Sequence, residues 1–211
     1  MTQVDAARTP VVVGIGQSIE REKVVTAIDL AERAARAAFA DAPGLEAQIE
    51  RVCMVAAIFS SAGKAPASAV ATRLGLRGVR QREASTVGGN TPQWLVTRLA
   101  AEIAAGKLRA ALVVGAEATR SLLQSNPGVD FMRGARASAA DADDTAADPV
   151  VGPSADGMIG PAEVAAGLMR PADVYAVFES ALAAAAGRSP QAQREHLGRL
   201  LGEVPHLQAG A

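Results

Sequence analysis

One cysteine and two histidines are the side chains of this sequence that most often act as nucleophiles or bases in enzymes. Cys53 lies in the apolar stretch ERVCMVAAIF, where a thiol packs as a small hydrophobic group and has little reactivity. His196 and His206 lie in the polar C-terminal part, far in sequence from Cys53 and from any cluster of carboxylates. We therefore expect an inert buried cysteine and two solvated histidines.

A short acidic run could be compared with a calcium loop, since it contains Asp141, Asp143, Asp144 and Asp148. The run lacks the central glycine and the terminal glutamate that such a loop needs. The single cysteine also excludes an intrachain disulfide and a cysteine-rich zinc site. We expect a solvated charged segment, no metal ion and no resident cofactor.

A glycine pair near the N-terminus, Gly14 and Gly16, follows an apolar run and could begin a dinucleotide-binding turn. The third glycine of that fingerprint would fall at Ile19, and the second predicted strand does not end in an acidic residue that could hold a ribose hydroxyl. A structural turn is the favoured interpretation. The alternative hypothesis, an enzyme that uses a nicotinamide cofactor, is supported by these two glycines alone.

Apolar runs and helical periodicity alternate over the first 121 residues. The apolar runs predict strands at residues 10–16, 50–59, 78–84 and 107–117. Apolar residues at helical spacing predict helices at residues 24–40, 67–74 and 93–105, the last of them largely buried. This βαβαβαβ order is typical of a parallel or mixed sheet covered by helices, so we expect an α/β domain at residues 1–121.

The chain changes character after Ser121. Residues 124–161 are rich in Gly, Ala, Asp and Pro and predict a long loop. Helical spacing returns at residues 161–169, 171–186 and 190–202, and no further strand is predicted. We expect residues 122–211 to form a mostly helical tail.

The charges of the chain nearly balance, with 21 Lys and Arg against 22 Asp and Glu. No basic patch is present that would bind a phosphate backbone, so nucleic acid is not an expected partner. No apolar run reaches the roughly 20 residues that span a bilayer, and the first residues lack the pattern of a signal peptide. We expect a cytoplasmic protein that does not bind membranes.

Several segments resemble the thiolase superfamily, especially its sterol-carrier-type and bacterial thiolase-like branches. The central one is STVGGNTPQWLVTRLAAEIAAGKLRAALVVGAE, and the opening TPVVVGIGQ and the tail DPVVGPSADGMIGPAEVAAGLM are similar to the family as well. The resemblance covers nearly the whole chain. It implies the N-terminal half of a thiolase-like fold, with a buried central helix, followed by a helical loop domain.

The resemblance also implies a site. Thiolases place a cysteine at the start of the central helix, where the dipole and backbone N–H groups stabilise a thiolate and an oxyanion. The family's spacing puts that position at Gly89, so no thiol is available there. Asn90 or Thr91 is expected to cap the helix, because Thr91 has no visible base to activate its hydroxyl. Gly88, Gly89, Asn90 and Thr91 are then expected to hold the carbonyl of a coenzyme A thioester.

The family takes its catalytic histidine and a second cysteine from a second half, to which nothing in this sequence corresponds. The resemblance therefore implies a relative of acetyl-CoA acetyltransferases of lipid metabolism that binds acyl-CoA with weak or absent acyl transfer. Two alternatives stay open. The chain could be a non-catalytic half that pairs with a partner polypeptide or as a homodimer, or it could be a subunit of a thiolase-like aldolase.

Overall fold

The computed structural model describes residues 9–128, 146–154, 160–168 and 171–202. The chain divides into two compact units, Met1–Ala155 (unit 1) and Asp156–Ala211 (unit 2). The division was predicted after Ser121, whereas unit 1 also includes a strand beyond Ser121 that joins its sheet.

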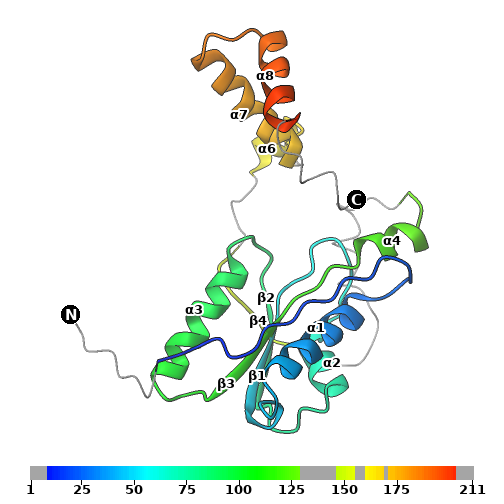
Figure 1. The fold of residues 1–211 in the computed structure, drawn as a ribbon, viewed down its shortest axis with the longest axis vertical. Coiled ribbons are helices and arrows are strands. Elements are labelled where there is room, and N and C mark those ends of the chain that lie inside the picture. Colours follow the sequence, from blue (N-terminus) through cyan, green and yellow to red (C-terminus); the bar gives the residue numbers. More distant parts are fainter. Residues whose placement is uncertain (1–8, 129–145, 155–159, 169–170, 203–211) are drawn as a thin grey trace, which may run out of the picture. The chain divides into compact units, whose positions relative to one another are not determined.

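Unit 1 is an α/β structure, as predicted (Figure 1). Its four strands are all parallel in the order β3-β1-β2-β4. The strands are β1 Ile49–Met54, β2 Gln81–Ser85, β3 Ala110–Val114 and β4 Val150–Val151. The helices are α1 Ala27–Asp41, α2 Pro66–Arg73, α3 Thr91–Ala104 and α4 Thr119–Ser125, with a 3₁₀ turn, η2, at Glu46–Gln48. Because the sheet grows in opposite directions from β1, α1 and α2 lie on one face and α3 on the other.

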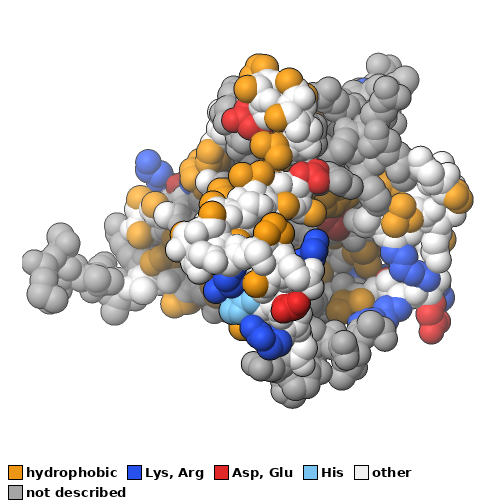
Figure 2. Space-filling model, turned by 90° about the horizontal axis from the view of Figure 1, so that it is seen from above, with side chains coloured by type: hydrophobic (Ala, Val, Ile, Leu, Met, Phe, Trp, Pro, Cys, Tyr) orange, Lys and Arg blue, Asp and Glu red, His pale blue; other side chains and the backbone are white. Residues whose placement is uncertain are grey.

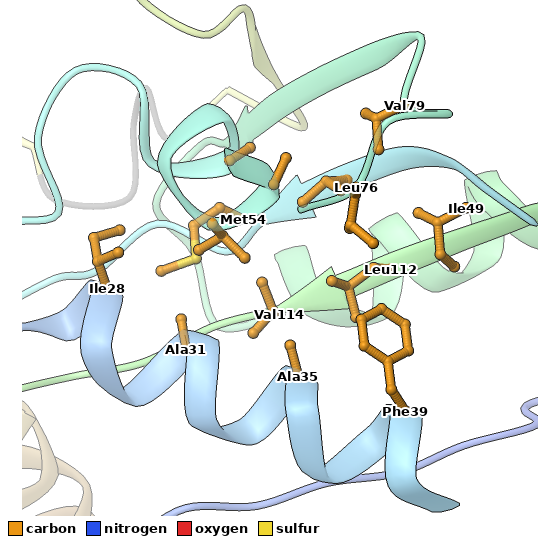
Figure 3. Close-up of a cluster of buried hydrophobic side chains, with 14 residues drawn as sticks. Ile28, Ala31, Ala35, Phe39, Ile49, Met54, Leu76, Val79, Leu112 and Val114 are labelled. Carbon is orange, nitrogen blue, oxygen red and sulfur yellow. The ribbon is translucent and has the colours of Figure 1, made fainter. Parts of the chain in front are cut away.

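Helix α1 begins with a capping box and buries one regular stripe. The Thr26 hydroxyl accepts from the Asp29 N–H at 3.1 Å, and the Asp29 carboxylate accepts from the Thr26 N–H at 2.8 Å. The buried stripe recurs every three or four residues and packs on Met54, Leu112 and Val114 of the sheet (Figure 3). Its residues are Ile28, Ala31, Ala35 and Phe39.

Helix α3 covers the opposite face with a smaller core. Leu95 and Leu99 pack with Cys53 and Leu108. The sequence analysis expected this helix to be largely buried, but Thr91, Leu95 and Leu99 are its only buried residues. Val96 of α3 lines a cavity whose opposite wall is residues 10–16 and is 42% exposed.

The first predicted strand, at residues 10–16, is wrong. This segment has no regular secondary structure and pairs with no strand of the sheet, and Val12 is 76% exposed. Gly14 and Gly16 lie so close to α1 that a Cβ on either would clash with a backbone oxygen of that helix. The β-branched run therefore did not specify a strand partner, and the two glycines allow the segment to approach α1 closely.

The prediction that no strand follows Ser121 is also wrong, because β4 pairs with the end of β2 through Ala84 and Ser85. Two residues of strand give no periodicity that a sequence could reveal.

Unit 2 is helical, as predicted. It contains α6 Pro161–Ala165, α7 Pro171–Ala185 and α8 Pro190–Gly202. Gly187, at φ +64°, forms the turn between α7 and α8. Among the described residues of both units, no helix is long and apolar enough to cross a membrane.

Candidate functional site

The start of α3 follows directly on the carboxyl end of β2, the edge of a parallel sheet where ligands commonly bind. After β2, the Thr86 N–H donates to the Val151 carbonyl at 2.8 Å, and the chain then turns through Gly88 and Gly89. The Thr91 N–H donates to the Gly88 carbonyl at 3.1 Å, and the helix begins. The structure thus brings the four predicted site residues together in one turn.

No side chain caps this helix. Asn90 occupies the N-cap position, but its backbone is already helical and its side chain makes no cap hydrogen bond. Thr91 is the first helical residue and only 1% exposed. The expected capping by Asn90 or Thr91 is therefore wrong, and among the described residues no anionic or hydroxyl side chain caps the positive end of the α3 dipole.

Gly88 and Gly89 differ in the space around them. A Cβ built on Gly88 would stand 2.9 Å from the Thr91 hydroxyl oxygen, so a side chain there would require Thr91 to shift. A Cβ on Gly89 would meet no atom within 4 Å. Gly89 is therefore the open position of the turn, from which a side chain or a ligand could reach the helix start.

Ser85 and Thr86 form the floor of this region, and the sequence analysis did not identify them. The Ser85 hydroxyl accepts from the Ala56 N–H and donates to the Thr86 carbonyl, both at 2.9 Å, which ties the ends of β1 and β2 together. The Thr86 hydroxyl is buried and has no hydrogen-bond partner among the described residues. A Cβ on Gly152 would clash with that hydroxyl, so a residue with a side chain would not fit there.

Glu117, three residues after the end of β3, holds the loop after β1. Its carboxylate accepts from the N–H groups of Ile58, Phe59 and Ser60, and from the Ser60 hydroxyl at 2.8 Å. A carboxylate that accepts this many hydrogen bonds is a structural anchor. Glu117 therefore fixes the loop after β1 against the end of β3.

A chain of ion pairs fixes α3 on the sheet. Arg98 donates two hydrogen bonds, of 2.9 and 3.0 Å, to the Glu83 carboxylate of β2 and one of 3.1 Å to Glu102. Glu102 also pairs with Arg51 of β1 at 2.9 Å. Burial alone would raise the pKa of Glu102, but Arg51 and then Arg98 outweigh it, so this pKa lies below its usual value. These contacts orient the helix whose N-terminus forms the site.

Cys53 lies beneath the same helix and is fully buried. Burial, and after it the charge of Glu83, raises the pKa of the Cys53 thiol to about 12. Its sulfur lies 3.7 Å from a Glu83 carboxylate oxygen. The expected inert cysteine is confirmed, since a thiol in this setting stays protonated at neutral pH.

The remaining candidates lie elsewhere. His196 belongs to α8 in unit 2, and His206 lies outside the described residues, as do Asp141, Asp143 and Asp144. The expectation that Asp148 is solvated is wrong: it is buried and accepts from the N–H groups of Ala67 and Ser68 at 2.7 and 3.1 Å, which caps α2 from a distant part of the chain. Among the residues that the structure describes, no group of three or more His, Cys, Asp and Glu could hold a metal ion.

The geometry around Gly14 and Gly16 does not suit a dinucleotide. Both glycines pack against the side of α1, and α1 begins only at Ala27, so no helix N-terminus follows the glycine turn directly. The same segment lines one wall of an apolar cavity of about 500 Å³, whose other walls come from α1, α3 and β3.

No family model matches the chain, and no curated protein matches it. A solved structure that is similar to part of it is a monomeric SCP2-thiolase like protein type 1 from Mycobacterium smegmatis, with 30% sequence identity and a TM-score of 0.45. The matched region covers 51% of this chain and 23% of that protein. The chain thus spans about a quarter of the length of this neighbour.

Proposed function

We propose that this chain is a thiolase-like protein that binds a coenzyme A thioester at the start of α3, with the thioester carbonyl directed at Gly89, and that it does not itself transfer the acyl group. The observation that carries the proposal is the open position at Gly89. It is a glycine turn at an uncapped helix N-terminus, with no atom within 4 Å of a side chain built there. A polarised carbonyl oxygen is favoured at such a place by the helix dipole and the backbone N–H groups.

The absence of turnover follows from the groups around the turn. Acyl transfer through an enzyme intermediate needs a nucleophile and a base that activates it. The only thiol, Cys53, is buried under α3 with a pKa of about 12. Within the described residues, the Thr91 hydroxyl is hydrogen-bonded to no histidine, lysine or carboxylate. Under this proposal the chain is related to the acetyl-CoA acetyltransferases of lipid metabolism but does not carry out their reaction. Its proposed location is the cytoplasm.

Calorimetric titration with acetyl-CoA and with a longer acyl-CoA tests this proposal, if released coenzyme A is assayed in the same samples with a thiol reagent. Saturable binding without release of coenzyme A supports it. Absence of binding to either thioester contradicts it, and release of free coenzyme A would contradict the lack of turnover.

A second candidate function is that of a non-catalytic half that binds a partner polypeptide through exposed apolar residues of α3 and of the turn before it. The observation that favours it is the exposure of Val96 on α3 and of Val87 just before the glycine turn. Exposed apolar groups beside an apolar cavity are typical of a surface that another chain covers. A thiolase-like aldolase subunit would be a special case of this arrangement. A chain that neither associates nor binds a hydrophobic dye would exclude it.

A further inference from the structure

The hairpin of α7 and α8 in unit 2 has polar contacts inside and apolar side chains outside. Arg188 donates to the Gln193 side chain at 2.7 Å, and Gln193 donates to the Glu179 carboxylate at 2.6 Å. Gln193 and Ala183 are the only buried residues of these two helices as described. The hairpin therefore has almost no apolar core of its own.

The apolar side chains of the hairpin are exposed and regularly spaced. On α7 they follow one face at intervals of three and four residues, as Tyr175, Phe178 and Leu182, and Phe178 is 57% exposed. On α8 the exposed ones are Leu200 and Leu201, and Leu197 is half-buried. Leu182, Leu197 and Leu200 line an open hollow of about 460 Å³ between the two helices. Hydrophobic side chains are visible on the surface of the helices that face the viewer in Figure 2.

Helices with an apolar stripe are stable when that stripe packs against another element. The charges on the hairpin indicate which one. Helix α7 carries two acidic residues, Asp173 and Glu179, and no basic one, whereas α8 carries Arg194 and Arg199 against Glu195 alone. Two copies of the hairpin can therefore place each negative α7 beside a positive α8. An anionic membrane would instead attract a strongly basic hairpin, whereas residues 171–202 carry three acidic residues, Asp173, Glu179 and Glu195, against three basic ones, Arg188, Arg194 and Arg199.

We propose that the α7–α8 hairpin associates with the same hairpin of a second copy of this chain, as a four-helix bundle with α7 of each copy against α8 of the other. The contact is isologous, so one surface serves both copies and the assembly closes as a dimer. Phe178 and Leu182 of one copy pack into the hollow beside Leu200 of the other. This inference uses only unit 2 and does not depend on thioester binding.

Light scattering of the full chain over a wide range of concentration tests the proposal. The expected mass is twice the 21.4 kDa of one chain. Phe178→Asp should weaken the dimer by at least about 30-fold, because a central aromatic anchor is replaced by a charge. Ile19→Asp is the control, since Ile19 is 66% exposed in unit 1 and should leave the dimer intact.

Arg199→Glu provides a second variant that replaces no apolar contact. It should also weaken the dimer, and the wild-type dimer should weaken at high salt. Circular dichroism verifies that each variant keeps its helices. A wild-type chain that is monomeric at every concentration overturns the proposal, whether or not it sediments with lipid vesicles. A dimer that Phe178→Asp leaves unchanged overturns it as well.

Discussion

Gly89 lies at the N-terminal end of α3 and Cys53 lies beneath the same helix, and their surroundings have opposite effects on a thiol. Cys53 lies under α3, away from water and next to the Glu83 carboxylate, which favours its neutral form. Gly89 lies at the N-terminal end, where an anion is stabilised and where space is open. The chain has its thiol at the position that suppresses reactivity and a glycine at the position that would promote it.

Gly89→Cys should convert the turn into a reactive site. The new thiol should have a lowered pKa and react with iodoacetamide well below pH 8, because the helix start favours the thiolate. Mass spectrometry of labelling against pH measures this, with the wild-type chain and its single Cys53 as control. If the introduced thiol were labelled no faster than Cys53, then position 89 would not face the helix start as described.

Asp148 is a buried carboxylate whose contribution can be measured separately. Asp148→Ala removes the acceptor for the Ala67 and Ser68 N–H groups and leaves both without a partner at the start of α2. We expect a loss of about 2 kcal/mol in the free energy of unfolding, measured by urea denaturation. Glu22→Ala, at an exposed position, should change it by less than about 0.5 kcal/mol. Equal effects of the two substitutions would argue against the capping role.

At the scale of elements, α1 is positioned by its capping box and by Arg73 of α2. The hydrogen bond from Arg73, followed by those from the Thr26 backbone and hydroxyl, lowers the pKa of Asp29 from 3.8 to about 2. These contacts link the start of α1 to the end of α2 on one face of the sheet.

The Asp29 carboxylate predicts a pH dependence of stability. Its folded pKa lies below the unfolded one, so its stabilisation is complete above about pH 4 and is lost as the pH falls toward about 2. We expect about 1 kcal/mol from this group, because solvent screens the partly exposed pair. Asp29→Asn should flatten the decline of unfolding free energy over this range, whereas Glu22→Gln should not. A decline that stays as steep in Asp29→Asn would show that Asp29 is not the group involved.

The sequence predicted the elements that carry their own pattern. The stripe from Ile28 to Phe39 indicated α1, and the apolar runs indicated β1 and β3, because burial on one face or both leaves a periodic or continuous signal. The prediction for residues 10–16 failed since β-branched residues favour an extended backbone but cannot specify a pairing partner. β4 was too short to leave a signal.

The candidate site was predicted from the resemblance to thiolases and not from a pattern of its own. That resemblance named Gly88, Gly89, Asn90 and Thr91, which the structure places at the start of α3. Thr86 and the role of Glu117 could not be found, because their partners, Gly152 and the loop at Ile58, are far away in sequence. Asp148 was misjudged because a single sequence does not show which member of an acidic run is buried.

At the scale of the whole molecule, the two units have separate proposed tasks. Unit 1 holds the helix start that would receive a thioester, and unit 2 holds the apolar hairpin that would pair with a second copy. The tasks can be tested apart, because Phe178→Asp changes only unit 2 and substitutions of Gly89 change only unit 1. Loss of the dimer with thioester binding retained is the expected behaviour of Phe178→Asp.

The most direct test of the central claim is calorimetric titration of Gly89→Leu with an acyl-CoA that the wild-type chain binds. A leucine fits the open space at Gly89 and covers the start of α3, so affinity should fall by at least about tenfold. Gly198→Leu, at an equally open glycine on α8, should bind as the wild type does. Unchanged affinity in Gly89→Leu, with the fold intact by circular dichroism, would contradict the placement of the thioester at the α3 N-terminus.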